Sequence, residues 1–307
     1  MKGEFDTKDH LIKATAEDVR VFAAVTTDLV RDGVKRHDCY PVAAAALGRT
    51  MTGALLFAAN LKNKEAVTIK INGGGALGSI VADAVPEGFV RGYVTNPHVD
   101  LPAKSPTESN PHGKIDVAGG VGRNGLVTVN RFTGLKEPIT GSAEIVSGEI
   151  AEDLTNYLAT SEQTPSSVGL GVLVGKDLDI ISAGGFLIQP LPNASDSSIT
   201  KLENNLKTID PVSTMIENGL DAEGIIRELL KGFDQINILS TTDLAFRCHC
   251  SKRRIEDTLM TLTEKDLNNL VEDGKAEVVC QFCGKKYQFS KEELVALRNV
   301  GLGKVHL

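Results

Sequence analysis

The chain has 307 residues, of which 41% are hydrophobic and 24% charged, the composition of a folded globular protein with room for two domains. Its formal net charge of −7 disfavours nucleic acid and anionic membranes as partners. The absence of tryptophan and the aromatic content of only 5% disfavour a stacking platform for bases.

The beginning of the chain predicts a cytoplasmic protein. Residues 1–6 are mostly polar and lack the hydrophobic core of a signal peptide. The most apolar stretch, residues 42–61, is rich in alanine and interrupted by Arg49, which indicates a buried helix and not a membrane span. We therefore expect no membrane partner, and a compartment in which cysteines are normally kept reduced.

The first 192 residues predict a domain of mixed helices and strands. Thr15 to Asp18 resembles a helix start, and apolar residues from Val19 to Val30 recur at helical spacing. Pro41 opens a second helix, and Ser147 is expected to cap a third. Hydrophobic patterning predicts strands over residues 67–71, 80–84, 90–95, 115–118, 126–132, 139–146, 168–174 and 180–192.

No catalytic constellation is recognisable in this part of the chain. The glycine run that begins at Gly73 follows a strand, but no GxxxxGK[ST] pattern accompanies it, and residues 80–84 continue as a strand and not as a phosphate-binding helix. A hairpin turn is the better interpretation. Cys39 stands alone and is given no role. We expect a protein that is not an enzyme.

A segment of different composition follows. Residues 193–198 are polar, and three short amphipathic helices are predicted after them. Helices of this length are marginal in isolation, so we expect their apolar faces to need a surface to cover. Those faces contain Ile199, Leu202, Leu206 and Ile209, then Val212, Met215, Ile216 and Leu220, and finally Ile225, Ile226, Leu229 and Leu230.

Four of the five cysteines form two close pairs near the C-terminus. Cys248 and Cys250 are followed, after 29 intervening residues, by Cys280 and Cys283 in the run CQFCGK. Four thiolates brought to one point are typical of a closed, tetrahedral structural zinc site. A disulfide framework, or cysteines that merely pack, are the alternatives. His249 lies between two of the sulfurs and is not expected to be a ligand.

The rest of this module is small. Two short helices, a hairpin around the second cysteine pair and a last helix that begins after Ser290 are predicted. So small a module cannot fold on apolar burial alone, and a bound metal would supply much of its folding free energy.

Several motifs together resemble the heat shock protein 33 family of redox-regulated chaperones. They are the CxC and CxxCGK pairs, the sequence SEQTPS at residues 161–166, and AGGFLIQPLP at residues 183–192. The resemblance covers the whole chain. The expected α+β architecture is an N-terminal β-sheet domain packed with helices (residues 1–195), a metastable helical linker (196–247) and a C-terminal tetra-cysteine zinc module (248–307).

The resemblance implies an ATP-independent holdase that prevents aggregation of unfolding proteins. One Zn2+ would be held by Cys248, Cys250, Cys280 and Cys283 in the reduced, inactive form. Oxidative stress would form the disulfides Cys248–Cys250 and Cys280–Cys283, release zinc, unfold the linker and favour a homodimer that binds unfolding clients. Cysteines one or two residues apart can pair with little chain movement, which agrees with that pairing. The client-binding surface stays unknown from the sequence.

Two rival functions were weighed. A zinc ribbon that binds nucleic acid would need a basic face, but residues 248–290 carry seven basic and seven acidic side chains. An enzyme in the N-terminal domain with a structural zinc tail is the second rival. Salt-dependent nucleic-acid binding would favour the first, and turnover of a small molecule would favour the second.

Overall fold

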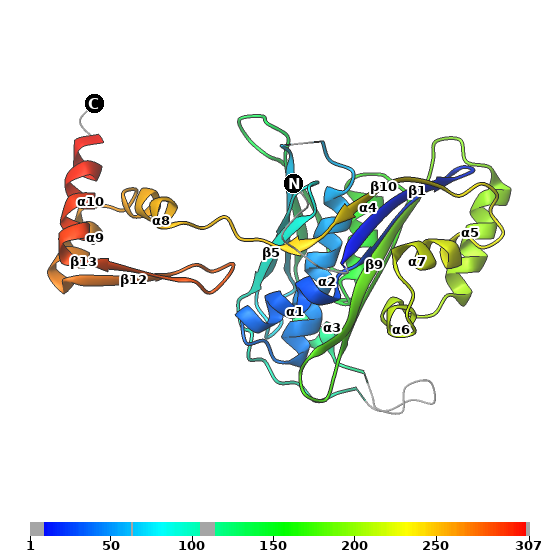
Figure 1. Cartoon of the computed structure of the whole chain (residues 1–307), viewed down its shortest axis with the longest axis horizontal. Coiled ribbons are helices and arrows are strands. Elements are labelled where there is room, and N and C mark those ends of the chain that lie inside the picture. The colour runs from blue at the N-terminus through cyan, green and yellow to red at the C-terminus, as the bar shows by residue number, and fades with distance from the viewer. Residues whose placement is uncertain (1–8, 63, 105–113, 305–307) are drawn as a thin grey trace. The chain divides into compact units, whose positions relative to one another are not determined.

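The computed structural model describes residues 9–62, 64–104 and 114–304; the polar residues 1–6 lie outside these ranges. The chain divides into two compact units, Met1–Arg247 and Cys248–Leu307 (Figure 1). The predicted α+β class is confirmed, since both units combine helices with antiparallel strands.

The first unit contains a five-stranded antiparallel sheet in the order β10-β1-β2-β9-β8. Its central strand β2 is buried on both faces, because Phe22 and Ala24 on one face and Val21 and Ala23 on the other are all inaccessible to solvent. The strands are β1 (His10–Ala16), β2 (Val19–Val25), β8 (Ser167–Val174), β9 (Ile180–Pro190) and β10 (Asn237–Asp243).

A second sheet has six strands in the order β11-β5-β4-β3-β6-β7, and only the β11–β5 pair is parallel. Its strands alternate as predicted: Val67, Ile69 and Ile71 of β3 are buried, whereas Lys70 and Asn72 are exposed. The strands are β3 (Ala66–Asn72), β4 (Ile80–Ala84), β5 (Phe89–Val94), β6 (Leu126–Phe132), β7 (Ile139–Glu144) and β11 (Ala245–Phe246).

Helix α2 (Pro41–Ala58) packs between the two sheets and forms the centre of the first unit. Its small alanine and glycine side chains allow both sheets to approach closely. Among the described helices it alone is long and apolar enough to cross a membrane, but 89% of it is buried inside the protein, as in a core helix. The helices α1 (Thr27–Arg36), α3 (Val117–Val121) and α4 (Ala151–Thr160) pack around it.

Three further helices cover the other face of the first sheet (Figure 1). They are α5 (Asp196–Thr208), α6 (Val212–Glu217) and α7 (Ala222–Leu229), which confirms the three predicted helices. Glycines in the sheet permit this close packing: a Cβ on Gly184 would lie 2.4 Å from Ile216, and one on Gly171 would lie 2.6 Å from the backbone of Ser213. The separate behaviour of residues 196–247 as a linker stays a prediction.

The second unit contains three helices and a hairpin. They are α8 (Lys252–Leu259), α9 (Glu264–Asp273), β12 (Lys275–Val279), β13 (Lys286–Ser290) and α10 (Lys291–Lys304). The last helix begins after Ser290 as predicted, and a capping box holds its start, because the Glu293 carboxylate accepts the backbone N–H of Ser290 at 2.9 Å and the Glu293 N–H donates to the Ser290 hydroxyl.

Three local predictions are wrong. The helix expected from Thr15 is the β1–β2 hairpin, with Glu17 in the turn at φ 45°. Because β2 is buried on both faces, it lacks the alternation that identifies a strand. Residues 117–121 form the short helix α3 instead of a strand, and Asp116 caps it.

Ser147 does not cap a helix, because α4 begins four residues later. The Asp153 carboxylate accepts the backbone N–H groups of Val146, Ser147, Gly148 and Ile150, and so fills the capping role from inside the helix. Strands β10 and β11 were not predicted.

A half-buried ion pair joins α2 to the segment before α4. The Arg49 guanidinium lies 2.8 Å from the Glu149 carboxylate, and the side chains are 11% and 19% exposed. Burial acts to raise the pKa of Glu149, but Arg49, Lys114 and Lys104 outweigh it and hold that pKa at about 2. This folded-state pKa lies below the ordinary 4.5, so the stabilisation is complete above pH 4.5 and is lost as the pH falls toward 2.

We predict that Glu149→Gln lowers the free energy of unfolding by about 3–5 kcal/mol, because it leaves the Arg49 charge buried without its carboxylate. The variant should also lose less stability than the wild type when the pH falls from 4.5 toward 2. Denaturant unfolding at a series of pH values measures both effects. Glu144→Gln on β7 is the exposed control, and an equal loss in both variants would contradict the assignment.

Candidate metal centre

Two segments of the second unit position the four cysteines. Cys248 and Cys250 lie in the extended chain before α8, whose first turn is capped by the Ser251 hydroxyl. Cys280 and Cys283 lie in the connection between β12 and β13. Antiparallel pairing of these strands brings Val279 opposite Lys286, and thereby closes the connection into a narrow turn.

Backbone hydrogen bonds fix the turn that carries the second pair. The carbonyl of Cys280 accepts the N–H of Gly284 at 2.8 Å and that of Cys283 at 3.3 Å, while the Cys280 N–H donates to Lys285. Gly284 has φ 71°, in the left-handed region that glycine adopts without steric cost. This is the physical reason for a glycine directly after the second cysteine of the CxxC pair.

The four sulfurs converge on one point. Cys248 Sγ lies 3.7 Å from Cys280 Sγ, and Cys250 Sγ lies 3.4 Å from Cys283 Sγ. All four lie within 4.8 Å of one another. Four sulfurs each about 2.3 Å from a central ion form a tetrahedron with edges of about 3.8 Å. The donor set and its spacing therefore fit a tetrahedral, thiolate-bound metal ion.

The local environment gives three of the thiols, those of Cys250, Cys280 and Cys283, different acidities. Burial acts to raise the pKa of Cys250, but hydrogen bonds from Tyr287 and from the other sulfurs outweigh it and lower that pKa to about 7. Burial raises the pKa of Cys280, and raises that of Cys283 to about 12. The Cys250 thiolate is therefore readily available, whereas a metal ion would have to displace a proton from Cys280 and from Cys283.

Tyr287 is a part of the centre that the sequence did not reveal. Its hydroxyl donates a hydrogen bond to Cys250 Sγ at 3.1 Å, and its ring is buried in the small core of this unit. The alternation on β13 predicts that Tyr287 and Phe289 are buried. It does not predict which atom the Tyr287 hydroxyl contacts. A hydrogen bond to a ligating atom orients that ligand and tunes the metal it holds.

The other sequence candidates fall outside the centre. The group of potential metal ligands contains the four cysteines and not His249, whose backbone carbonyl accepts a hydrogen bond from Arg254 at 3.0 Å. Cys39 is buried in the first unit, where burial raises its pKa to about 12 and keeps it a protonated thiol. This state agrees with the absence of a proposed role.

Known proteins resemble the chain over nearly its whole length. The family model described as "Hsp33 protein" matches residues 9–290. The chain belongs to the Hsp33 family. It is 48% identical to the 33 kDa chaperonin of Bacillus subtilis over 294 residues, which are 95% of this chain and 98% of that protein. The 33 kDa chaperonin of Listeria innocua is also 48% identical, over 94% of this chain and 98% of that one.

A solved structure of the same family has the same fold. The crystal structure of the 33 kDa chaperonin, a heat shock protein 33 homologue, of Thermotoga maritima matches with a TM-score of 0.86 at 34% identity. The match covers 96% of this chain and 99% of that chain. The predicted family is thus confirmed. Hsp33 proteins are chaperones, which bind client proteins and do not form an enzyme class.

We predict that Tyr287→Phe weakens zinc binding, with zinc as the probe metal, by about 10-fold, because Cys250 loses a hydrogen bond while the ring still fills the core. Competition against a chromogenic chelator measures the affinity of the reduced protein. His249→Ala should bind zinc as tightly as the wild type. A Tyr287→Phe affinity equal to that of the wild type would show that the hydroxyl does not tune the centre.

Proposed function

We propose that this chain is a redox-regulated, ATP-independent holdase of the cytoplasm, active in the stress response. In the reduced state it binds one zinc ion and is inactive; oxidation makes it bind unfolding proteins and prevent their aggregation. The observation that carries the proposal is the convergence of four sulfurs in a chain of the Hsp33 chaperone family.

Zinc is the metal we propose, because an all-thiolate, tetrahedral donor set selects it over harder ions such as magnesium or calcium. Bound zinc would hold Cys248, Cys250, Cys280 and Cys283 as thiolates. The second unit has only a small hydrophobic core, whose buried members are Leu259, Val271, Tyr287, Phe289 and Leu294. We infer that the sulfur–metal bonds contribute most of its stability.

Oxidation is proposed to form Cys248–Cys250 and Cys280–Cys283. Each pair of thiolates gives two electrons to one hydrogen peroxide molecule, which takes up two protons from the solvent, so that the O–O bond breaks, one S–S bond forms and two water molecules are released. Two sulfur distances between the pairs are 3.4 and 3.7 Å, and all four sulfurs lie within 4.8 Å of one another, so any S–S bond of about 2.0 Å requires the centre to rearrange. Once the unit unfolds, the short loops within each pair are the easiest to close.

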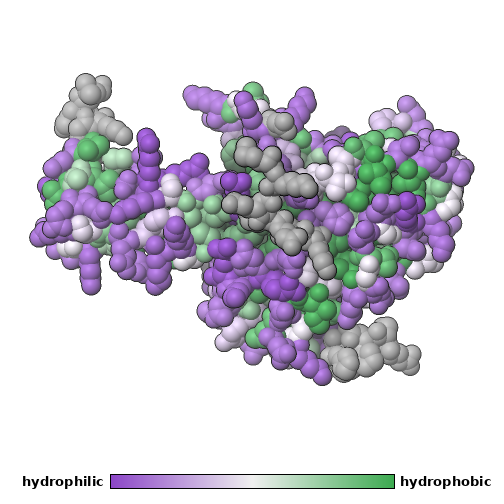
Figure 2. Space-filling view, in the orientation of Figure 1, coloured by the Kyte–Doolittle hydropathy of each residue, from purple (hydrophilic) through white to green (hydrophobic). Residues whose placement is uncertain are grey.

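The proposed switch acts on α5, α6 and α7. Their apolar faces bury Leu202, Met215, Ile226 and Leu229 against the first sheet, with Leu206 and Ile216 packed beside them. Figure 2 shows hydrophobic residues among hydrophilic ones at the surface of this region, and the members of the cluster itself are buried. Detachment of the helices would expose it, and an apolar patch of that kind can hold an unfolding client.

Loss of the metal supplies the driving force. Structural zinc contributes about 10 kcal/mol or more to the folding of small modules, comparable to the whole stability of a typical domain, about 5–15 kcal/mol. The second unit would unfold, and the covalent connection at Arg247 would no longer end in a folded anchor. The helices, each too short to be stable alone, would then be free to leave the sheet.

We further propose that the oxidised form is a homodimer, that it has no nucleic-acid or membrane partner, and that it catalyses no reaction. The zinc-ribbon alternative requires a basic face, whereas residues 248–290 have balanced charges. Salt-dependent binding of RNA or DNA by the reduced protein would favour that alternative.

We predict that the reduced, zinc-loaded protein fails to suppress aggregation of a thermally unfolding client, and that peroxide pretreatment makes it effective without ATP. Light scattering measures the suppression. Replacement of Cys280 and Cys283 by serine should abolish tight zinc binding. Equal suppression before and after peroxide would rule out redox regulation.

The variant Ile226→Asp tests the linker step. A carboxylate at this fully buried position cannot stay in the apolar cluster, so α7 should detach even when the cysteines are reduced. We expect the reduced variant to suppress aggregation at least about half as well as the oxidised wild type. The reason is that burial of an unpaired charge is among the most destabilising changes that a single substitution can make. Lys231→Asp adds the same side chain at an exposed position and should stay inactive.

A further inference from the structure

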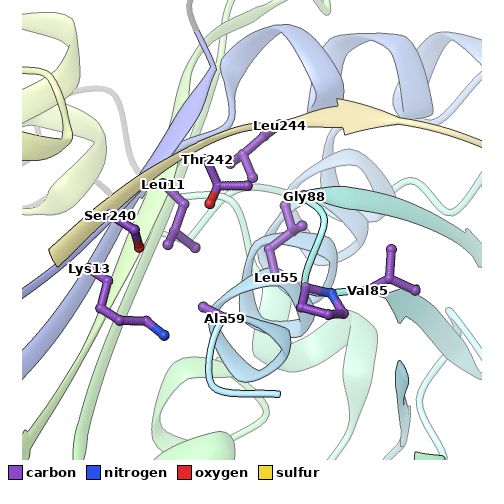
Figure 3. Close-up of a pocket in the computed structure, with 10 residues that line it drawn as sticks. Leu11, Lys13, Leu55, Ala59, Val85, Gly88, Ser240, Thr242 and Leu244 are labelled. Carbon is purple, nitrogen blue, oxygen red and sulfur yellow. The ribbon is translucent and has the colours of Figure 1, made fainter. Parts of the chain in front are cut away.

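A small cavity lies on the α2 face of the first sheet, away from α5–α7 (Figure 3). It opens to solvent: the empty space of about 300 Å³ within it includes open solvent, and Ser240 at its edge is exposed. Four separate segments build its walls: β1, β10, the C-terminal end of α2, and the β4–β5 turn. The wall from the β4–β5 turn is possible because Gly88 has φ 89°, and a Cβ there would lie 2.1 Å from the Asp243 carbonyl oxygen.

The polar side of the cavity carries an unbalanced positive charge. Among the residues that the structure describes, Lys13 forms no ion pair; its Nζ lies 5.4 Å from the centre of the Phe22 ring. Arg20 lies over the same ring, and within the described residues its side-chain hydrogen bonds go to the neutral amides of Asn60 and Gln189. Burial, together with the charge of Arg20, lowers the pKa of Lys13. An anion would therefore be stabilised here.

Two hydroxyl-bearing residues line the cavity from β10. Ser240 is directly opposite Lys13 in the β1–β10 register, and Thr242 is opposite Leu11. Figure 3 shows both hydroxyl oxygens and the Lys13 nitrogen directed toward the end of α2. Within the described part of the chain, neither hydroxyl donates to a protein acceptor. Leu55 and Ala59 of α2 and its following turn provide an apolar surface on the other side.

We propose that this cavity binds a short-chain monocarboxylate, with the carboxylate against Lys13 and Ser240 and the short aliphatic chain against Leu55 and Ala59. The small size admits only a ligand of a few heavy atoms, and the pairing of a cation and hydroxyls with an apolar wall matches a molecule that is charged at one end only. Charge-assisted hydrogen bonds would supply most of the affinity.

The ligand would contact β1 and β10 at once, and so would bind only while these strands are paired. By mass action it favours the paired state. The strand β10 follows α7 in the chain and leads to the cysteine unit. The affinity for the ligand would therefore fall if this segment left the sheet. Slower amide exchange in residues 237–243 on ligand addition is expected from the fold alone and does not depend on redox regulation.

The experiment titrates the full, reduced, zinc-loaded protein with sodium butyrate and follows amide chemical shifts. Butan-1-ol and butylammonium chloride, at matched ionic strength, are the neutral and cationic controls. We expect saturable binding of butyrate alone, with shifts in residues 237–243. Lys13→Met retains the aliphatic stem and should weaken binding at least ~10-fold, and Ser240→Ala by about 5-fold.

Lys70→Met, at an exposed position on β3, is the matched control and should bind butyrate as the wild type does. Unchanged affinity in both Lys13→Met and Ser240→Ala, equal binding of butan-1-ol, or no saturable binding of butyrate would each overturn the proposal. Circular dichroism and zinc content establish that the variants are folded. If Lys13→Met does not fold, the binding measured with Ser240→Ala decides the test.

Discussion

Burial of the first sheet on both faces is the constraint on which the rest of the molecule depends. Strands β1, β2 and β9 present apolar side chains to α2 on one face and to α5–α7 on the other. The cover on the α2 face is one long helix fixed between two sheets. The cover on the other face is three short helices, none of which would be stable alone. We therefore propose that α5–α7 are the part of this unit that detaches most readily.

The second unit differs from the first in the source of its stability. It is small, its hydrophobic cluster is limited, and its two cysteine-bearing segments are brought together at four sulfur atoms. A structure of this kind depends on the chemistry of those atoms more than on apolar burial. One thiol is easily ionised because Tyr287 donates to it, whereas burial keeps Cys283 protonated in the absence of metal. We therefore propose that the chemical state of the four sulfurs controls the folding of this unit.

The sequence predicted best where one residue type determines the chemistry. Four cysteines in two close pairs were sufficient to predict that their sulfurs converge on one point, and strict alternation was sufficient for β3. Prediction failed where tertiary contacts decide. Strand β2, buried on both faces, has no alternation, and β10 is a polar edge strand that forms because β1 needs a partner. The hydrogen bond from Tyr287 requires the fold, and the cavity beside Lys13 requires four segments distant in sequence.

The central claim is that the state of the four sulfurs controls whether α5–α7 stay on the sheet. Hydrogen exchange measured residue by residue, on the reduced zinc-loaded protein and on peroxide-treated, active protein, tests it most directly. The account predicts that amides in residues 199–232 are protected in the reduced form and exchange at rates near those of an unfolded chain after oxidation, while β3 stays protected in both. Protection of residues 199–232 that persists in the active, oxidised protein would contradict it.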